Sequence, residues 1–276
     1  MALIAAVGGL VVGLVVWTVG VDLFSSPPLR RVNRRGIELA TAGGLVVILA
    51  TMLAAAVVAL VEAAMDDTLD DSARAALLVA VLGFGLLGLL DDLVAAERVR
   101  GFRGHLSALA QGRITTGAAK LFGGLAVAVI AAGLVRDEGF GWLVLDAVLI
   151  AAAANLTNLF DLVPGRTTKV AALGWVALLV AVGIGPELVA VSFVVGATVA
   201  LLRAETTERL MLGDTGANVV GAALGVGAVA TLGHTTRLCV AAVVVALNLV
   251  SEVVSFSTVI DRFRALRWLD DLGRPD

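Results

Sequence analysis

The stretch GLLGLLDDLVAAERVRGFRGH, residues 85–105, joins an apolar segment to an acidic pair and then to a basic segment. It completes a run of sixteen uncharged, almost wholly apolar residues, Ala75 to Leu90, and then reaches Asp91 and Asp92. An apolar run of nearly this length that stops at charged residues is typical of a helix crossing a bilayer. We therefore place a membrane boundary at the two aspartates.

The composition of the whole chain supports a membrane location. The chain has 276 residues, of which 59% are hydrophobic and 16% charged, and its mean hydropathy is +1.01. Soluble domains are closer to a quarter charged. The apolar residues form repeated stretches of about twenty residues rather than the short alternating segments of a β-barrel. The sequence predicts an all-α, polytopic membrane protein with a single integral membrane domain, residues 1–276.

The apolar stretches predict about nine transmembrane helices: 2–24, 39–62, 75–92, 117–135, 142–160, 168–184, 187–203, 216–233 and 236–256. Alternate connections then share a side, and seventeen of the twenty Lys and Arg residues fall on one of them. The positive-inside rule makes that side cytoplasmic. We expect a plasma (inner) membrane protein with its N-terminus outside and its C-terminal tail, about 257–276, in the cytoplasm. The tail is predicted to form an interfacial amphipathic helix that uses Phe263, Leu266, Trp268 and Leu269.

Three polar motifs fall where predicted spans meet the cytoplasm. Asp91 and Asp92 end one span, ANLTNLFDLVPGR (154–166) carries Asp161, and ERLMLGDTGAN (208–218) carries Asp214. Carboxylates that lie close together repel one another, and a divalent cation relieves that repulsion. Magnesium binds one or two carboxylates together with waters and phosphate oxygens. The pattern favours a metal-dependent enzyme that acts on phosphates at the cytoplasmic face.

Basic residues in the same connections are predicted to contact phosphate: Arg98, Arg100, Arg103, Arg113, Lys120, Arg166 and Lys169. Each motif also has a structural interpretation. The Asp91–Asp92 pair could be a helix end facing water, Asp214 a helix N-cap, and Asn155 and Asn158 interhelical hydrogen-bonding groups. The glycines of GFGLLG (83–88) are interpreted as sites of close helix packing, because this motif lies inside a span.

Five segments in order resemble the polyprenyl-phosphate N-acetylhexosamine-1-phosphate transferases over roughly residues 30–260. They are ATAGG (40–44), LLDDL (89–93), TTGAAK (115–120), NLFDLVPG (158–165) and LGDTGAN (212–218). The resemblance implies that a UDP-activated amino sugar gives its sugar-1-phosphate to a polyprenyl phosphate, undecaprenyl or decaprenyl, and releases UMP. It implies Mg²⁺ as the cofactor, with Mn²⁺ as an alternative, no nucleic-acid partner, and a homodimer.

The resemblance also implies roles for individual residues. Asp214 is the expected principal metal ligand, and Asp91 and Asp92 lie beside the metal. One of these two deprotonates the lipid phosphate, or else acts as a direct nucleophile. Asp161 and Asn158 are expected to complete the nucleotide-sugar and metal environment.

The remaining candidate residues are predicted to bind substrate. Lys120 is expected to bind phosphate, with Asn155, Arg166 and Lys169 in the same environment. The basic loop that carries Arg103 and His105 is expected to contact diphosphate or to order a lid, and for His105 a structural hydrogen bond is the alternative.

The chain departs from the family pattern at two places. Pro164 replaces the second aspartate of the NLTDGLDG motif, and proline cannot accept the same hydrogen bond from its side chain. The histidine-rich motif of the peptidoglycan enzyme is absent, and residues 251–274 offer Arg262, Arg264 and Arg267 instead. Two alternatives to an active transferase therefore stay open. One is a divergent relative that binds the lipid carrier or an envelope partner without catalysis, and the other is a transporter that uses intramembrane carboxylates such as Asp146.

Overall fold

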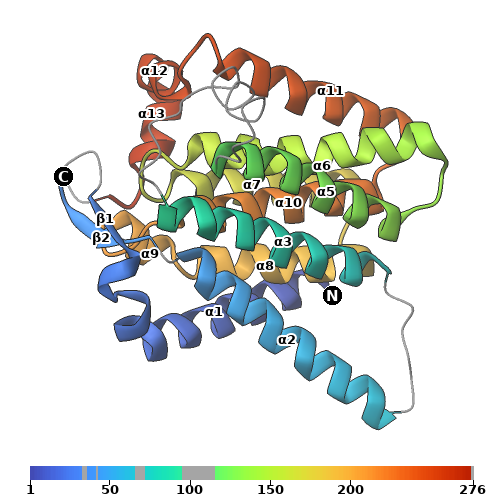
Figure 1. Cartoon of the computed structure of the whole chain (residues 1–276), viewed down its shortest axis with the longest axis horizontal. Coiled ribbons are helices and arrows are strands. Elements are labelled where there is room, and N and C mark those ends of the chain that lie inside the picture. The colour runs from blue at the N-terminus through green and yellow to red at the C-terminus, as the bar shows by residue number, and fades with distance from the viewer. Residues whose placement is uncertain (33–35, 42, 66–71, 95–115, 275–276) are drawn as a thin grey trace.

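A computed structural model of the chain describes residues 1–32, 36–41, 43–65, 72–94 and 116–274. Long helices run roughly side by side through most of it, and the two chain ends lie at opposite ends of the bundle (Figure 1). The helices are α1 Ala2–Phe24, α2 Gly43–Met65, α3 Ser72–Val94, α5 Thr116–Val135, α6 Phe140–Phe160, α7 Arg166–Val182, α8 Val189–Val199, α9 Leu202–Thr206, α10 Gly213–Thr231, α11 His234–Ser251, α12 Phe256–Arg262 and α13 Arg264–Asp271. The expectation of an all-α membrane protein is confirmed at this level.

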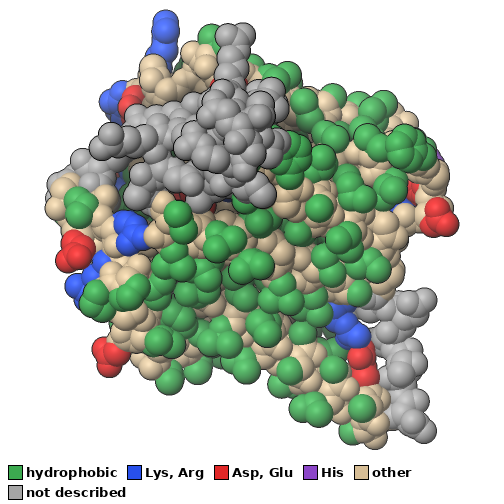
Figure 2. All heavy atoms as spheres, in the orientation of Figure 1, with side chains coloured by type: hydrophobic (Ala, Val, Ile, Leu, Met, Phe, Trp, Pro, Cys, Tyr) green, Lys and Arg blue, Asp and Glu red, His purple; other side chains and the backbone are tan. Residues whose placement is uncertain are grey.

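Seven helical segments of the described chain are long and apolar enough to cross a membrane. They are α1, α2, α3, most of α5, α6, the stretch Pro186–Thr206 and α11. The other two predicted spans are also helical, but α7 has 17 residues and α10 begins with the polar sequence GDTGAN. The count of nine spans and the sidedness of the termini therefore stay predictions. Hydrophobic side chains cover the middle of the molecular face in Figure 2, as contact with lipid tails requires.

One small sheet departs from the all-helical expectation. Strands β1 (Arg30–Val32) and β2 (Glu38–Ala40) pair antiparallel after α1, beyond a short 3₁₀ turn at Pro27–Leu29. The carbonyl oxygen of Ala40 accepts a hydrogen bond from the backbone of Met211, and the amide of Gly43 donates to the Met211 carbonyl oxygen. These bonds fasten the start of α2 to the segment that leads into α10.

Helix α10 is the central helix, packed against α2, α3, α6, α7 and α8. Most of its residues are small and buried, so neighbouring backbones approach it closely. A Cβ atom added at Gly88 of α3 would lie 2.5 Å from the carbonyl oxygen of Asp214, and one added at Gly44 of α2 would overlap Gly216. The interpretation of the GFGLLG glycines as close-packing residues is confirmed at Gly88. This packing places the end of α3 directly against the start of α10.

A polar cluster lies at the opposite end of the bundle from these contacts. The fully buried Arg237 of α11 pairs with Glu138, and its Nε lies 3.2 Å from Asp146 Oδ1 and its guanidinium 4.7 Å from the Trp142 ring centre. His234 stacks on the same ring and brings Nε2 to 3.2 Å from Glu138. Hydrogen bonding, chiefly from Arg237, lowers the pKa of Glu138 to about 2. Asp146 is thus an ion-pair partner between α6 and α11.

Candidate active site

Three helix ends bring the predicted carboxylates to one place. Asp91 and Asp92 lie in the last turn of α3, Lys120 in the first turns of α5, and Asp214 at the start of α10. The ammonium group of Lys120 lies 3.4 Å from Asp91 Oδ2 and makes a shorter ion pair with Asp214 Oδ2. Lys120 therefore bridges two carboxylates that come from segments more than a hundred residues apart.

Asp92 is held by the first turn of α10. Its Oδ1 accepts a hydrogen bond from the backbone N–H of Asp214 at 3.0 Å. Its Oδ2 accepts from the N–H of Thr215 at 3.0 Å and from Thr215 Oγ1 at 2.6 Å. The first N–H groups of a helix have no intrahelical partner and carry partial positive charge, so a carboxylate is well placed to bind them. Asp92 thus caps α10 from another helix and sets the position of Asp214.

Helix α6 contributes an amide to the same cluster. In the orientation that satisfies both of its polar atoms, the Asn158 amide donates to Asp214 Oδ1 at 2.9 Å and accepts from Lys120 Nζ at 3.0 Å. The preceding residue, Thr157, donates from Oγ1 to the carbonyl oxygen of Ala217 at 2.7 Å. These contacts hold the end of α6 against the first turns of α10.

Asp161 follows α6 directly and lies behind this cluster. Its Oδ1 is fully buried, and burial raises the pKa of Asp161 well above its usual range. The negative charges of Glu205, Asp214 and Asp92 raise the pKa further. The protonated form of Asp161 is therefore stabilised beside the ionised groups of the cluster.

Glu205 is a functional candidate that the sequence analysis did not single out. Its side chain is completely buried, it accepts a hydrogen bond from Thr168 Oγ1, and the backbone N–H groups of Gly165 and Leu212 also donate to it. It therefore connects the start of α7, the segment after Asp161 and the segment before α10. The signal in the sequence was slight: one acidic residue beside two threonines at the end of an apolar span.

Two of the predicted phosphate-binding residues contact the C-terminal segment instead of the cluster. Arg166, 4% exposed, donates from Nε and Nη2 to both carboxylate oxygens of Asp270 at 2.8 Å, and from Nη1 to Ser257 Oγ at 2.8 Å. Lys169 donates to the carbonyl oxygen of Asp270. Hydrogen bonds from Arg166 and Arg274 outweigh the effect of burial and hold the pKa of Asp270 below its usual value.

The other candidates are not part of the cluster. Asn155 donates to Asn248 Oδ1 of α11 at 2.7 Å, as expected of an interhelical hydrogen-bonding group. Arg103 and His105 lie outside the described residues. No group of three or more His, Cys, Asp or Glu side chains in position to hold a metal ion occurs among the described residues. Both oxygens of Asp92 accept hydrogen bonds from α10, and the expected metal-binding role of Asp91, Asp92 and Asp214 stays a prediction.

The cluster nevertheless fits a magnesium ion on chemical grounds. Asp91, Asp214 and Asn158 direct oxygen atoms at one cationic group, the Lys120 ammonium. Magnesium is commonly held by one or two carboxylates, with waters and substrate phosphates as its other ligands. Asp91 and Asp214 are the residues suited to that role, and Asn158 is a third oxygen donor.

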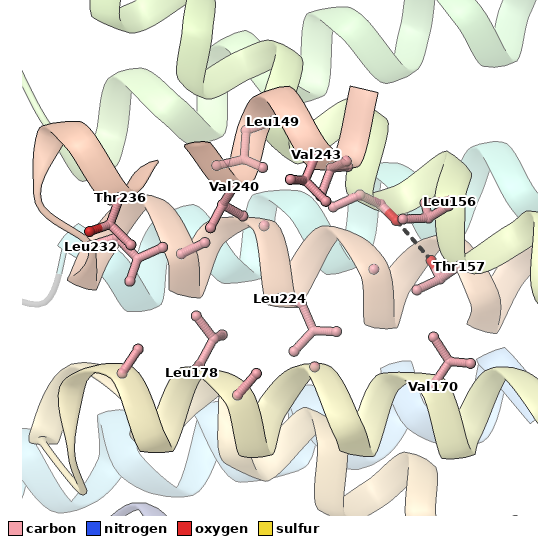
Figure 3. Close-up of a pocket in the computed structure, with 18 residues that line it drawn as sticks. Leu149, Leu156, Thr157, Val170, Leu178, Leu224, Leu232, Thr236, Val240 and Val243 are labelled. Carbon is pink, nitrogen blue, oxygen red and sulfur yellow. Dashed lines mark hydrogen bonds between the residues drawn. The ribbon is translucent and has the colours of Figure 1, made fainter. Parts of the chain in front are cut away.

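An apolar pocket of about 410 Å³ is lined in part by Thr157, the residue before Asn158 (Figure 3). It is formed by α6, α7, α10 and α11, and its wall is almost entirely hydrophobic. At one end it reaches Thr157 and Val170, next to the cluster, and at the other end it reaches Leu232 and Thr236. Along α7 it extends from Val170 to Ala181, about 16 Å at 1.5 Å per residue.

The fold and the site define the chain as a helical membrane protein with a carboxylate–lysine cluster at one end of its bundle. No protein-family model matches it. Two curated relatives are phospho-N-acetylmuramoyl-pentapeptide-transferases. The one from Oceanobacillus iheyensis is 27% identical over 211 residues, which are 66% of this chain and 60% of that protein. The one from Desulforamulus reducens is 31% identical over 196 residues, 66% of this chain and 59% of that protein.

These similarities confirm the relationship expected from the five motifs. The chain is a relative of the polyprenyl-phosphate N-acetylhexosamine-1-phosphate transferase family. It spans about 60% of the length of the curated relatives that it matches.

Proposed function

We propose that this protein transfers a sugar-1-phosphate, in the first place N-acetylhexosamine-1-phosphate, from a UDP-sugar to a polyprenyl phosphate and releases UMP. The reaction takes place at the cytoplasmic membrane face and belongs to cell-envelope glycan synthesis. The relationship to the two transferases supports the reaction class. The departures at Pro164 and at the missing histidine motif favour a substrate other than the pentapeptide-bearing sugar.

The observation that carries the proposal is the meeting of Asp91, Asp214 and Asn158 around one cationic group at the ends of α3, α6 and α10. Negative charge exceeds positive charge in this cluster, so a further cation is stabilised there. Magnesium, when bound, supplies charge neutralisation for the diphosphate of the UDP-sugar.

The contacts suggest a division of work among the aspartates. Both carboxylate oxygens of Asp92 accept hydrogen bonds from the first turn of α10. Asp92 therefore positions Asp214 rather than accepting a proton. Asp91 faces Lys120 instead of a helix terminus, and it is the carboxylate placed to take the proton of the lipid phosphate. The Lys120 ammonium lies beside Asp91 and Asp214 and is placed to contact a phosphate oxygen.

The pocket between α6, α7, α10 and α11 is suited to the polyprenyl chain. Its hydrophobic wall begins near Thr157, the residue before Asn158, and follows the helices into the predicted membrane region. An isoprenoid chain buried there leaves its phosphate at the cluster, where a water-soluble nucleotide sugar approaches from the other side.

The test is UMP release by purified protein supplied with magnesium, polyprenyl phosphate and a panel of UDP-amino sugars. Asp214→Asn is expected to lower the rate by at least about 100-fold, because it removes a carboxylate suited to hold the magnesium that would neutralise transition-state charge. Asp22→Asn, an exposed isosteric substitution in α1, serves as the matched control and keeps full activity. Chelation of magnesium abolishes release.

Failure of every UDP-sugar, with folded protein and an active relative as positive control, contradicts the proposal. Binding of polyprenyl phosphate without UMP release favours the non-catalytic alternative.

A further inference from the structure

Helix α13 separates its side chains cleanly by polarity. At 3.6 residues per turn, one face carries apolar residues and the other carries charged residues. The apolar face comprises Ala265, Leu266, Trp268, Leu269 and, just past the helix end, Leu272. The charged face comprises Arg264, Arg267, Asp270 and Asp271.

The helix is attached to the rest of the protein along one edge. Asp270 is buried in its ion pair with Arg166, and Arg274 reaches back to the carbonyl oxygen of Pro164 at 3.3 Å. Stacking of Phe256 on Phe160, with ring centres 4.6 Å apart, holds the preceding helix α12. These contacts fix the orientation of α13 while most of its apolar face stays exposed, with Trp268 64% and Leu272 54% exposed.

Further exposed apolar residues occur at the end of α11 and just past it, namely Leu249 and Val253, the latter 87% exposed. Arg262 and Arg264 are exposed in the same region. Helix α13 and the C-terminal end of α11 lie on the same side of the bundle as the start of α7, to which Asp270 is bonded (Figure 1). Tryptophan and arginine are the residues that membrane–water interfaces favour, because each combines an apolar body with a polar end.

We propose that α13 lies in the surface of the membrane, with its apolar face among the lipid chains and its arginines against the headgroups of anionic phospholipids. Amphipathic helices bind interfaces through buried apolar area together with attraction to anionic lipids. This inference requires only that the bundle spans a membrane, so it stands or falls independently of the proposed function.

The apolar face is tested by cysteine labelling in lipid nanodiscs that contain phosphatidylglycerol and phosphatidylcholine. In a Cys239→Ala background, Leu272→Cys is compared with Asp271→Cys, its neighbour on the charged face. Both side chains are well exposed on the protein itself, so a charged, water-soluble maleimide would modify them equally in the absence of lipid contact. We expect strong loss of labelling at position 272 only, and equal labelling of both after denaturation. Equal rates in nanodiscs overturn the proposal.

The headgroup preference is tested by replacing phosphatidylglycerol with phosphatidylcholine. Protection of Leu272→Cys is expected to weaken in the neutral lipid, by about fivefold for each arginine at the surface. Arg262→Gln with Arg264→Gln removes this dependence on anionic lipid. The matched pair Arg203→Gln and Arg209→Gln, two exposed arginines outside α12 and α13, leaves it intact. The anionic-lipid assignment is overturned if labelling at position 272 does not depend on lipid charge. It is also overturned if the Arg262/Arg264 and Arg203/Arg209 variants change that dependence equally.

Discussion

Substituting Asp92 by asparagine tests whether this carboxylate acts by holding α10. Asparagine keeps one acceptor oxygen, so the bond from the Asp214 N–H at 3.0 Å can persist. Its amide nitrogen, however, faces the N–H of Thr215, and a donor then meets a donor. Loss of one or two charge-assisted hydrogen bonds, each worth about 1.5–3 kcal/mol, predicts a fall of about 1.5–6 kcal/mol in the free energy of unfolding.

The magnitude is measured by denaturant titration in mixed micelles, and a double-mutant cycle assigns it to the right contact. Thr215→Val removes only the 2.6 Å hydroxyl bond to Asp92 and is expected to cost about 1–2 kcal/mol. Since the two residues share a bond, the double variant should be less destabilised than the sum of the single variants by at least about 0.5 kcal/mol. Asp91→Asn serves as the comparison, with loss of UMP release and little change in stability.

Additive effects of Asp92→Asn and Thr215→Val would refute the capping role. So would full stability of Asp92→Asn combined with complete loss of UMP release, because that result makes Asp92 a chemical participant rather than a positioning residue.

Three further predictions concern packing, the C-terminal segment and pH. Gly88→Val introduces a side chain against the backbone of α10 and should cost about 1–3 kcal/mol and most of the activity, whereas Gly141→Ala, where an added Cβ meets nothing within 4 Å, should be neutral. Asp270→Asn weakens the ion pair of the buried Arg166 and should lower the free energy of unfolding by about 3–5 kcal/mol. The neighbouring Asp271→Asn, at a side chain 62% exposed, should change it little, and unfolding titrations measure both variants. Because the folded pKa of Glu138 is lowered from 4.5 to about 2, its stabilising effect is complete above pH 4.5 and lost as the pH falls toward 2; Glu138→Gln should flatten this part of the stability–pH profile.

The helices and the region of the site could be inferred from the sequence because their signals are local. A bilayer has one thickness, so apolar runs of the matching length indicate spans, and the charges that interrupt them mark span ends. The positions of Asp91, Asp161 and Asp214 at such ends were sufficient to expect that they lie on one side. The same motifs were sufficient to indicate the transferase family.

Partnerships between side chains depend on the packing of helices that are far apart in the sequence, and here the tertiary structure was required. Asp91 and Asp92 both end the same apolar segment in the sequence. Successive residues of an α-helix are rotated by about 100° about the helix axis, so the two side chains point in different directions. One therefore meets Lys120 and the other meets the start of α10. In the sequence, Arg166 likewise has the features of a phosphate-binding residue. In the structure, Asp270 of the C-terminal segment is its carboxylate partner.

The sequence by itself determined that this chain is a helical membrane protein, related to sugar-phosphate transferases, with acidic motifs at the ends of apolar segments, because apolar length and charge position act locally along the chain. Only the tertiary structure decided which aspartate caps a helix and which aspartates contact Lys120. It also showed that Glu205 is buried among three segments and that Arg166 and Lys169 donate hydrogen bonds to the C-terminal helix. The physical reason is that ion pairs and hydrogen bonds are made across distances of about 3 Å, which only the packing of the helices establishes.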